Sequence, residues 1–279
     1  MPVPHMLPQT TAFKKEVWTY HRKNRRDFPW RNTHDPYHIL VSEIMLQQTQ
    51  VERVINYYKD FLKKFPTTKA LASAPLSEVL KLWKGLGYNR RAVYLKRTAE
   101  DIENKFGGKF PKEYASLLSL SGVGQSTAGA LMNFAFEIPT PFIETNIRSV
   151  FLYHFFKDKE KVSDKEVLEI ITLVNDQVCR SQTSTREWYY ALYDYGTHLK
   201  KTIGNQNHRS KHHTKQSTFK GSNRELRALI LADILAHTKT TSSAITRRLN
   251  KDKSAVEKNL SAFIKEGTVV KNGSTYSIV

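Results

Sequence analysis

A glutamate lies where helical spacing favours an apolar side chain. Within the run 36–49, Glu43 falls on the face formed by Ile39, Leu40 and Leu46. An apolar environment raises the pKa of a carboxyl group, and a glutamate still protonated near neutral pH can act as a general acid. A lone glutamate in such a place is more often a solvated or capped residue at a helix edge. Glu43 is therefore a catalytic candidate that needs support from elsewhere in the chain.

The segment Gly122-Val123-Gly124, followed by Gln125 and Ser126, is the second place where residue types point to chemistry. Glycines one residue apart allow a tight turn between helices and expose backbone N–H groups where the second helix begins. Such N–H groups can bind a phosphate. By itself a Gly-x-Gly is a weak signal, and a plain corner between two helices is the default.

The charge of the chain indicates a polyanionic partner. Its 279 residues include 44 Lys and Arg against 26 Asp and Glu, a formal net charge of +18. Nucleic acid is the commonest partner of so basic a protein. No stretch approaches the roughly 18 apolar residues of a membrane span, and the N-terminus lacks the features of a signal peptide, so a cytoplasmic protein is expected. The single cysteine, Cys179, cannot supply the ligands of a cysteine-ligated iron–sulfur cluster.

These residues must be positioned by helices. Apolar spacing and breaks at proline and glycine predict a mainly α domain over residues 1–200. The expected helices span residues 12–23, 36–47, 50–64, 68–73, 76–83, 89–104, 112–118, 125–136, 145–156, 164–178 and 186–199. Ser126 is expected in the first turn of its helix, and Thr145 is expected to cap the helix that follows it.

A basic linker and a second small domain are expected after residue 200. The stretch 201–222 is rich in Lys, His, Ser, Gln and Asn and contains no acidic residue, which predicts a linker that DNA could order. Residues 223–279 are predicted to form a winged-helix-like domain of three helices and a hairpin that turns at Asn272-Gly273. Its basic residues outnumber the acidic ones about two to one, which favours phosphate contacts slightly over a protein-interaction role.

Three motifs in the first domain resemble the helix-hairpin-helix DNA glycosylases. They are SEIMLQQT at 42–49, WKGLGY at 83–88 and GVGQSTAG at 122–129. The resemblance covers about residues 28–196 and is closest to the MutY-like adenine glycosylases, with further matches at 29–31 and 35–37. It implies a two-lobed helix-hairpin-helix glycosylase fold, followed here by the winged-helix-like domain.

The resemblance implies a role for each matching residue. Glu43 matches the general acid that protonates the leaving purine, and position 144 matches the carboxylate that stabilises the oxocarbenium-like sugar, supported by Asn146. The remaining matches concern DNA. They are the wedge residues Gln48 and Tyr88, the base-pocket residues Trp30 and Arg31, and the hairpin of Gly122, Val123 and Gly124 with the adjoining Gln125 and Ser126, which grips the DNA backbone and holds a cation at Gly122 and Gly124 without side-chain ligands.

The chain departs from the family pattern in three places, and a fourth position distinguishes it from bifunctional relatives. Glu144 replaces the usual aspartate, and Gln125-Ser126 stands where bifunctional relatives carry the Schiff-base lysine, which implies a monofunctional enzyme. No cysteine follows residue 196, where the family commonly has its iron–sulfur loop, so no cofactor is expected. The winged-helix-like domain stands in place of the Nudix-like domain that senses 8-oxoguanine.

The sequence thus predicts a DNA glycosylase, in base excision repair, that flips and removes a mispaired or damaged base. Adenine opposite 8-oxoguanine or guanine is the first expectation. Uracil, thymine, hypoxanthine or a modified base, and a catalytically silent DNA-binding protein, are the alternatives. The expected partner is double-stranded DNA with a lesion or mispair, bound by a monomer at the nucleoid and without any membrane.

Overall fold

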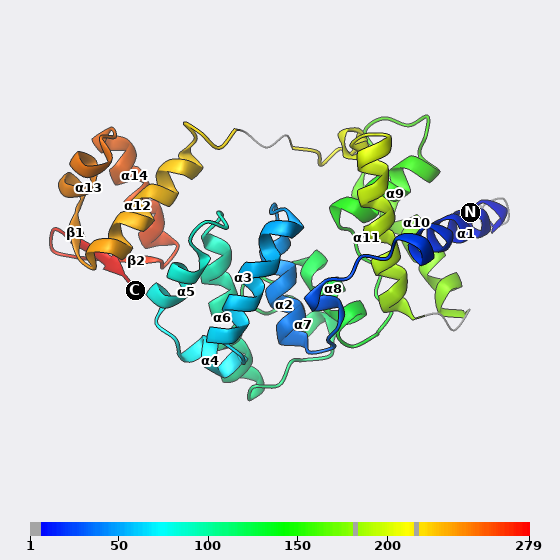
Figure 1. Cartoon of the computed structure of the whole chain (residues 1–279), viewed down its shortest axis with the longest axis horizontal. Coiled ribbons are helices and arrows are strands. Elements are labelled where there is room, and N and C mark those ends of the chain that lie inside the picture. Colours follow the sequence, from blue (N-terminus) through cyan, green and yellow to red (C-terminus); the bar gives the residue numbers. More distant parts are fainter. Residues whose placement is uncertain (1–6, 181–183, 215–217) are drawn as a thin grey trace. The chain divides into compact units, whose positions relative to one another are not determined.

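The computed structural model describes residues 7–180, 184–214 and 218–279. The chain divides into two compact units, each built from separate segments. Unit 1 consists of Met1–Leu40, Lys112–Leu118 and Val123–Lys215, and unit 2 consists of Val41–Pro111, Ser119–Gly122 and Gln216–Val279. Figure 1 labels the α-helices of both units and the strands β1 and β2. The mainly helical fold expected from the sequence is confirmed. None of the helices in the described ranges is long and apolar enough to cross a membrane.

Unit 1 is built around long helices that share aromatic side chains. Its elements are α1 (Leu7–Asn24), the 3-10 turns Pro29–Arg31 and Gln206–Arg209, α7 (Tyr114–Leu118), α8 (Gln125–Phe134), α9 (Thr145–Phe155), α10 (Asp164–Arg180) and α11 (Thr185–Thr202). Phe13 of α1 lies edge-on to Phe151 of α9 at a centroid distance of 5.3 Å and to Trp188 of α11 at 6.0 Å. These edge-to-face contacts join three helices into one core.

A glycine lets α9 and α11 approach closely. A Cβ atom added at Gly196 in α11 would lie 2.6 Å from the carbonyl oxygen of Asn146 in α9. Any side chain at position 196 would therefore push α11 away from α9, the helix that carries Glu144 and Asn146 at its start. The N-terminal end of α9 thus has a fixed place against α11.

Unit 2 contains the helices of the middle of the chain. They are the last part of α2 (Pro36–Leu46), which begins in unit 1, then α3 (Val51–Lys64), α4 (Thr68–Ser73), α5 (Leu76–Trp83) and α6 (Arg90–Phe106). Helix α6 packs against α4 and α5, and its side chains Leu95 and Ala99 are buried. The short helices at 68–73 and 76–83 have the predicted bounds.

The C-terminal module, residues 223–279, also belongs to unit 2. It contains α12 (Asn223–His237), β1 (Thr240–Thr241), α13 (Ser242–Leu249), α14 (Lys253–Lys265), β2 (Val269–Asn272) and β3 (Thr275–Ile278). In the described chain its strands form a sheet of order β1-β3-β2. The predicted hairpin is confirmed, but its turn is Gly273-Ser274, one residue later than expected, because Asn272 still pairs with Thr275. The sequence missed β1, because a two-residue strand depends on its pairing with β3. The winged-helix assignment of this module stays a prediction.

Part of the predicted linker is folded instead. Helix α11 continues to Thr202, and the side chains of Asn207 and Arg209 are buried in unit 1. Arg209 donates hydrogen bonds to the carbonyl oxygens of Leu152 at 2.7 Å and Phe156 at 2.6 Å. The expectation of a linker is wrong for this part, because Arg209 satisfies carbonyls at the end of α9. Residues 215–217 of the same stretch lie outside the described residues.

Candidate active site and DNA interface

Glu43 lies on the helix face that the sequence predicts. Asp35 caps α2 by accepting a 2.8 Å hydrogen bond from the backbone N–H of Tyr37. Glu43 is half-buried, while Ile39 and Leu40, one turn earlier, are buried. Glu43 therefore follows buried apolar residues of its own helix by one turn. The setting fits the proposed acid, and the role itself stays a prediction.

Glu144 is the N-cap of α9. Its Oε2 accepts a 2.7 Å hydrogen bond from the backbone N–H of Asn146, and its Oε1 accepts one from the Asn146 side-chain amide at 3.2 Å. The expectation that Thr145 caps this helix is wrong, because the longer glutamate side chain folds back and takes the cap position itself. The structure thus brings together Glu144 and Asn146, two of the predicted site residues, and their hydrogen bonds orient both side chains.

Burial raises the pKa of the Glu144 carboxyl group above its ordinary value. The N–H groups of Asn146 and Ile147 and the positive charge of Arg148 act in the opposite direction, but burial outweighs them. Arg148 is itself held by paired hydrogen bonds to Asp164, at 2.8 and 2.7 Å. Glu144 therefore combines a fixed geometry with a raised pKa, and perturbed pKa values of this kind are frequent among functional carboxylates.

The Gly-x-Gly turn joins α7 to α8 and is anchored on α6. Ser121 donates its backbone N–H to Asp101 at 2.7 Å, and its carbonyl oxygen accepts from the Thr98 hydroxyl at 2.6 Å. Gly122 has a φ of +79°, and a Cβ atom there would lie 2.5 Å from the Cβ of Tyr94. Only glycine fits this position without displacement.

The start of α8 offers backbone donors. Gly124 is the N-cap residue and has no side chain to accept a hydrogen bond from the first turn. Gly124 and Gln125 are exposed, Ser126 is partly exposed in the first turn as expected, and Val123 is buried. This arrangement can bind an anion, as the sequence predicts. A cation at Gly122 and Gly124 stays a prediction.

Gln48 and Tyr88, the two predicted wedge residues, share an unusual backbone conformation. Their φ angles are +56° and +49°, in the left-handed region that non-glycine residues seldom adopt. Gln48 is exposed in the turn after α2, and Tyr88 is half-buried in the turn before α6. Strained residues of this kind persist where the surrounding structure holds them, and they are frequent at functional sites.

One arginine holds both of these turns. The buried guanidinium of Arg91, from the first turn of α6, donates Nη1 to the carbonyl oxygens of Met45 at 2.8 Å and Gln47 at 2.6 Å. Its Nη2 donates to the carbonyl oxygen of Gly87 at 2.9 Å. The bonded carbonyls of Gln47 and Gly87 directly precede Gln48 and Tyr88 in the chain. Burial lowers the pKa of Arg91 to about 10, so the group stays charged at neutral pH.

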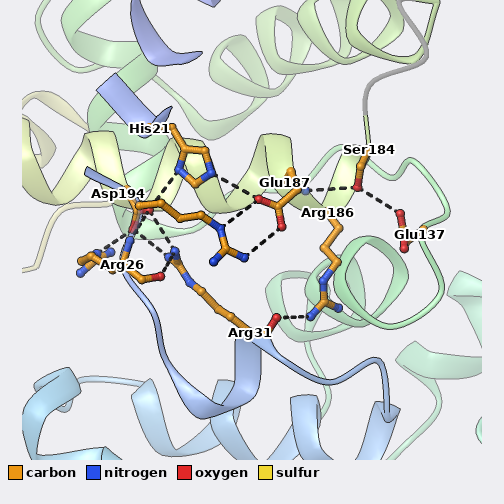
Figure 2. A network of polar contacts seen from close by, with 9 residues as sticks. His21, Arg26, Arg31, Glu137, Ser184, Arg186, Glu187 and Asp194 are labelled. Carbon is orange, nitrogen blue, oxygen red and sulfur yellow. Dashed lines mark hydrogen bonds and ion pairs between the residues drawn. The ribbon is translucent and has the colours of Figure 1, made fainter. Parts of the chain in front are cut away.

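Trp30 and Arg31 are buried, and Arg31 belongs to a polar network that centres on Asp194 of α11 (Figure 2). Arg31 donates to both carboxylate oxygens of Asp194, at 2.9 and 2.8 Å, and Arg26 and His21 also contact this carboxylate. Arg31 therefore connects the turn that follows α1 to helix α11. The base-pocket role of Trp30 and Arg31 stays a prediction.

The Asp194 network is electrostatically self-consistent. Burial alone would raise the pKa of Asp194, but hydrogen bonds from His21 and Arg31 hold it well below its usual range. His21 bridges Asp194 and Glu187 at 3.1 and 3.3 Å, and these acceptors raise its pKa against the effect of burial. The His21 contact lowers the pKa of Glu187 to about 2.

Sequence reasoning missed Arg91 and Asp194, although both leave a signal. Each is a charged residue at helical spacing from buried apolar ones: Arg91 precedes Leu95 by one turn, and Asp194 follows Tyr190 by one turn. This is the same pattern that singled out Glu43. Glu43, Gln48, Tyr88 and Gly122 belong to unit 2, whereas Glu144 and Asn146 belong to unit 1. The pairing of Glu43 with Glu144 therefore stays a prediction.

Known proteins share these elements. The family described as HhH-GPD superfamily base excision DNA repair protein matches residues 41–175. This range includes the turns that carry Gln48 and Tyr88, the Gly-x-Gly turn and the start of α9. Residues 41–175 of the chain therefore carry the domain of the helix-hairpin-helix glycosylase superfamily.

Members of this superfamily with curated names are similar over about half of the chain. The adenine DNA glycosylase of Buchnera aphidicola subsp. Baizongia pistaciae is 43% identical over 136 residues, which are 49% of this chain and 39% of that relative. The adenine DNA glycosylase of Homo sapiens is 40% identical over 153 residues, which are 52% of this chain and 28% of that relative. The chain thus matches less than half of the length of either protein.

A solved structure of a thermostable thymine-DNA glycosylase matches more of the fold. It is 29% identical with a TM-score of 0.59, and the match covers 68% of this chain and 86% of that one. The superfamily fold thus extends beyond the region that the adenine glycosylases share with this chain.

Proposed function

We propose that this chain is a monofunctional DNA glycosylase that flips a base out of double-stranded DNA and hydrolyses its N-glycosidic bond. Adenine opposite 8-oxoguanine or guanine is the proposed substrate. The observation that carries the proposal is the similarity to adenine DNA glycosylases at 40 to 43% identity. The family match also spans each proposed catalytic position.

The chemistry needs two carboxyl groups with different acidities. Glu43 would protonate the departing base, and Glu144 would stay ionised beside the sugar as positive charge develops on it. The contacts of Glu144 support this role, since Asn146 and the start of α9 orient its carboxylate. The replacement of the family aspartate adds one methylene, and a carboxylate misplaced by about 1 Å can cost about a hundredfold in rate.

DNA would be held by its backbone and by the gap left by the flipped base. The exposed N-terminal end of α8 would bind a phosphate, and Gln48 and Tyr88 would fill the stack beside the extruded nucleotide. Gln125 and Ser126 provide no amine for a Schiff base, which supports hydrolysis without strand cleavage. In this proposal the protein acts as a monomer at the nucleoid and needs no cofactor.

Thymine is the second candidate base. The thymine-DNA glycosylase structure matches 68% of this chain at 29% identity, a broader match than that of the adenine glycosylases. A pocket for thymine would need different polar contacts from a pocket for adenine, because the two bases present different donors and acceptors.

Single-turnover excision on duplexes containing adenine, thymine, uracil or hypoxanthine in defined mispairs tests the proposal. We expect wild type to excise adenine opposite 8-oxoguanine and Glu43→Gln to be inactive. Glu144→Asp, which restores the family residue, is expected to retain or increase the rate. Binding without excision of any base would overturn the enzyme proposal, and thymine excision would replace adenine as the substrate.

A further inference from the structure

The C-terminal module reaches the Tyr88 turn through one arginine. Arg224, in the first turn of α12, donates Nη1 to the Tyr88 hydroxyl at 2.5 Å, and its guanidinium lies 5.2 Å from the centre of the Tyr88 ring. A charged donor that also stacks on the ring fixes both the position and the tilt of a tyrosine. The ring lies 5.5 Å from the guanidinium of Arg91 as well.

The position of Arg224 is costly within its own helix. A positive charge in the first turn faces the positive end of the helix dipole, where Glu225 is the favourable neighbour. Arginine is a good helix former, but neither the helix dipole nor the cap, which is Ser222, favours a positive charge at this position. The positive charge of Arg224 instead has a partner outside α12, the Tyr88 hydroxyl.

A second contact joins the C-terminal module to α6, the helix of unit 2 that follows the Tyr88 turn. Arg97 of α6 donates to the carbonyl oxygen of Glu266 at 2.6 Å, at the end of α14. Gly267 follows with a φ of +61°, and a Cβ atom there would lie 2.4 Å from Nη2 of Arg97. The Glu266 carboxylate is bound by Arg227 at 2.6 Å. The module is therefore docked on α6 at a second point, independent of Arg224.

We infer that the C-terminal module positions the Tyr88 wedge, with Arg224 as the positioning residue that acts through the Tyr88 hydroxyl. This inference rests on the proposed glycosylase function. A tyrosine inserted into the base stack must meet the gap at a fixed angle, and free rotation of its side chain would lower the fraction of productive encounters. The module thus contributes to DNA distortion and does more than add charge.

The test uses the full chain and two readouts. One is single-turnover excision of adenine opposite 8-oxoguanine. The other is the fluorescence of 2-aminopurine placed next to a tetrahydrofuran abasic site, which reports unstacking by the wedge and requires no excision. The variants are Arg224→Ala, Tyr88→Phe and the double variant, with Arg247→Ala as the control, because Arg247 is an exposed arginine of the same module. Urea midpoints verify that each variant is folded.

We expect Arg224→Ala and Tyr88→Phe each to lower the excision rate and the 2-aminopurine signal at saturating enzyme, the rate by about tenfold, as for loss of one charge-assisted hydrogen bond. The double variant should be no worse than either single one, because both remove the same contact. Arg247→Ala should change affinity slightly and leave the saturated 2-aminopurine signal unchanged.

Other outcomes overturn the inference. Additive losses, or equal effects of Arg224→Ala and Arg247→Ala, would show that Arg224 acts only through its charge. A faster reaction in Arg224→Ala would show that the contact restrains the wedge. Failure of wild type to excise any base would refute the proposed function alone, since the abasic duplex still tests positioning. A wild-type complex without a 2-aminopurine signal would refute positioning.

Discussion

Glu144 caps α9, and the proposed function gives the same side chain a chemical role. As the N-cap of α9 it satisfies a backbone N–H group, and its hydrogen bonds with Asn146 fix the carboxylate. An N-cap residue contributes about 1 kcal/mol to stability whether or not it is catalytic. The two roles can be separated, because capping tolerates a neutral acceptor and stabilisation of an oxocarbenium ion does not.

The acidity of Glu144 predicts the pH dependence of excision. Because burial raises its pKa above 4.5, the ionised form needed for catalysis is lost as the pH falls through that raised value. The acid limb of the single-turnover rate should therefore lie above pH 4.5. Glu144→Gln should be at least a hundredfold slower at every pH and lack this limb, yet lose only about 1 kcal/mol of stability. An acid limb retained in Glu144→Gln would assign it to another group.

At the scale of elements, Arg91 joins two turns that are far apart in the sequence. It binds carbonyls at the end of α2 and in the turn before α6, and so holds Gln48 and Tyr88 in left-handed conformations. A planar guanidinium with several donors suits this task, and a lysine ammonium cannot reach the same set of carbonyls.

Arg91→Lys should therefore loosen both wedge turns. We expect it to lower the free energy of unfolding by about 2 kcal/mol, as for buried carbonyls left without donors, and to reduce the 2-aminopurine signal at the abasic site. Arg90→Lys is the matched control, since Arg90 is the exposed neighbour on α6. Equal behaviour of the two variants in urea titrations and fluorescence would contradict the role given to Arg91.

The Asp194 network joins α1, the turn after it and α11, and its stability should depend on pH in both directions. Glu187, lowered from 4.5 to about 2, contributes above pH 4.5, and its contribution is lost as the pH falls toward 2. His21 has a raised pKa, so its contribution is complete below pH 6.5 and is lost as the pH rises through the raised value. The network therefore stabilises unit 1 most between about pH 4.5 and 6.5.

Asp194→Asn should weaken the His21 part of this effect, whereas Glu187 keeps its contacts with His21 and Arg25. The substitution leaves Arg31 without its charged partner and His21 with Glu187 alone, so we expect unit 1 to lose roughly 3 kcal/mol at pH 6. Urea midpoints from pH 3 to 9 should show a flatter profile than in wild type. Asp27→Asn, at an exposed carboxylate, is the control and should follow the wild-type curve. A profile of unchanged shape in Asp194→Asn would show that other groups dominate.

At the scale of the whole molecule, the charge of +18 should govern DNA affinity. Each phosphate neutralised on duplex DNA contributes about −0.9 to the slope of log K against log salt concentration. We expect a slope steeper than about −4 for an undamaged duplex in fluorescence anisotropy. Removal of two exposed lysines of α14, Lys253 and Lys258, should make the slope shallower by up to about 2 if the C-terminal module contacts phosphates. An unchanged slope would exclude these two contacts.

The sequence by itself determined the helical fold, most helix bounds to within about two residues, and the motifs by which the superfamily is identified. These follow from local periodicity, from glycine and proline, and from short runs of residue types. It also placed Glu43, Gln48, Tyr88 and Glu144 as candidates, although only by resemblance for the last three.

Only the tertiary structure decided which residues hold the candidates in place. Glu144 rather than Thr145 caps α9, because a side chain can fold back on its own helix. Arg91, Asp194 and Arg209 are buried because distant carbonyls and charges satisfy them, and such partners leave no periodic trace in the sequence. The contact of Arg224 with Tyr88 joins residues that are 136 positions apart.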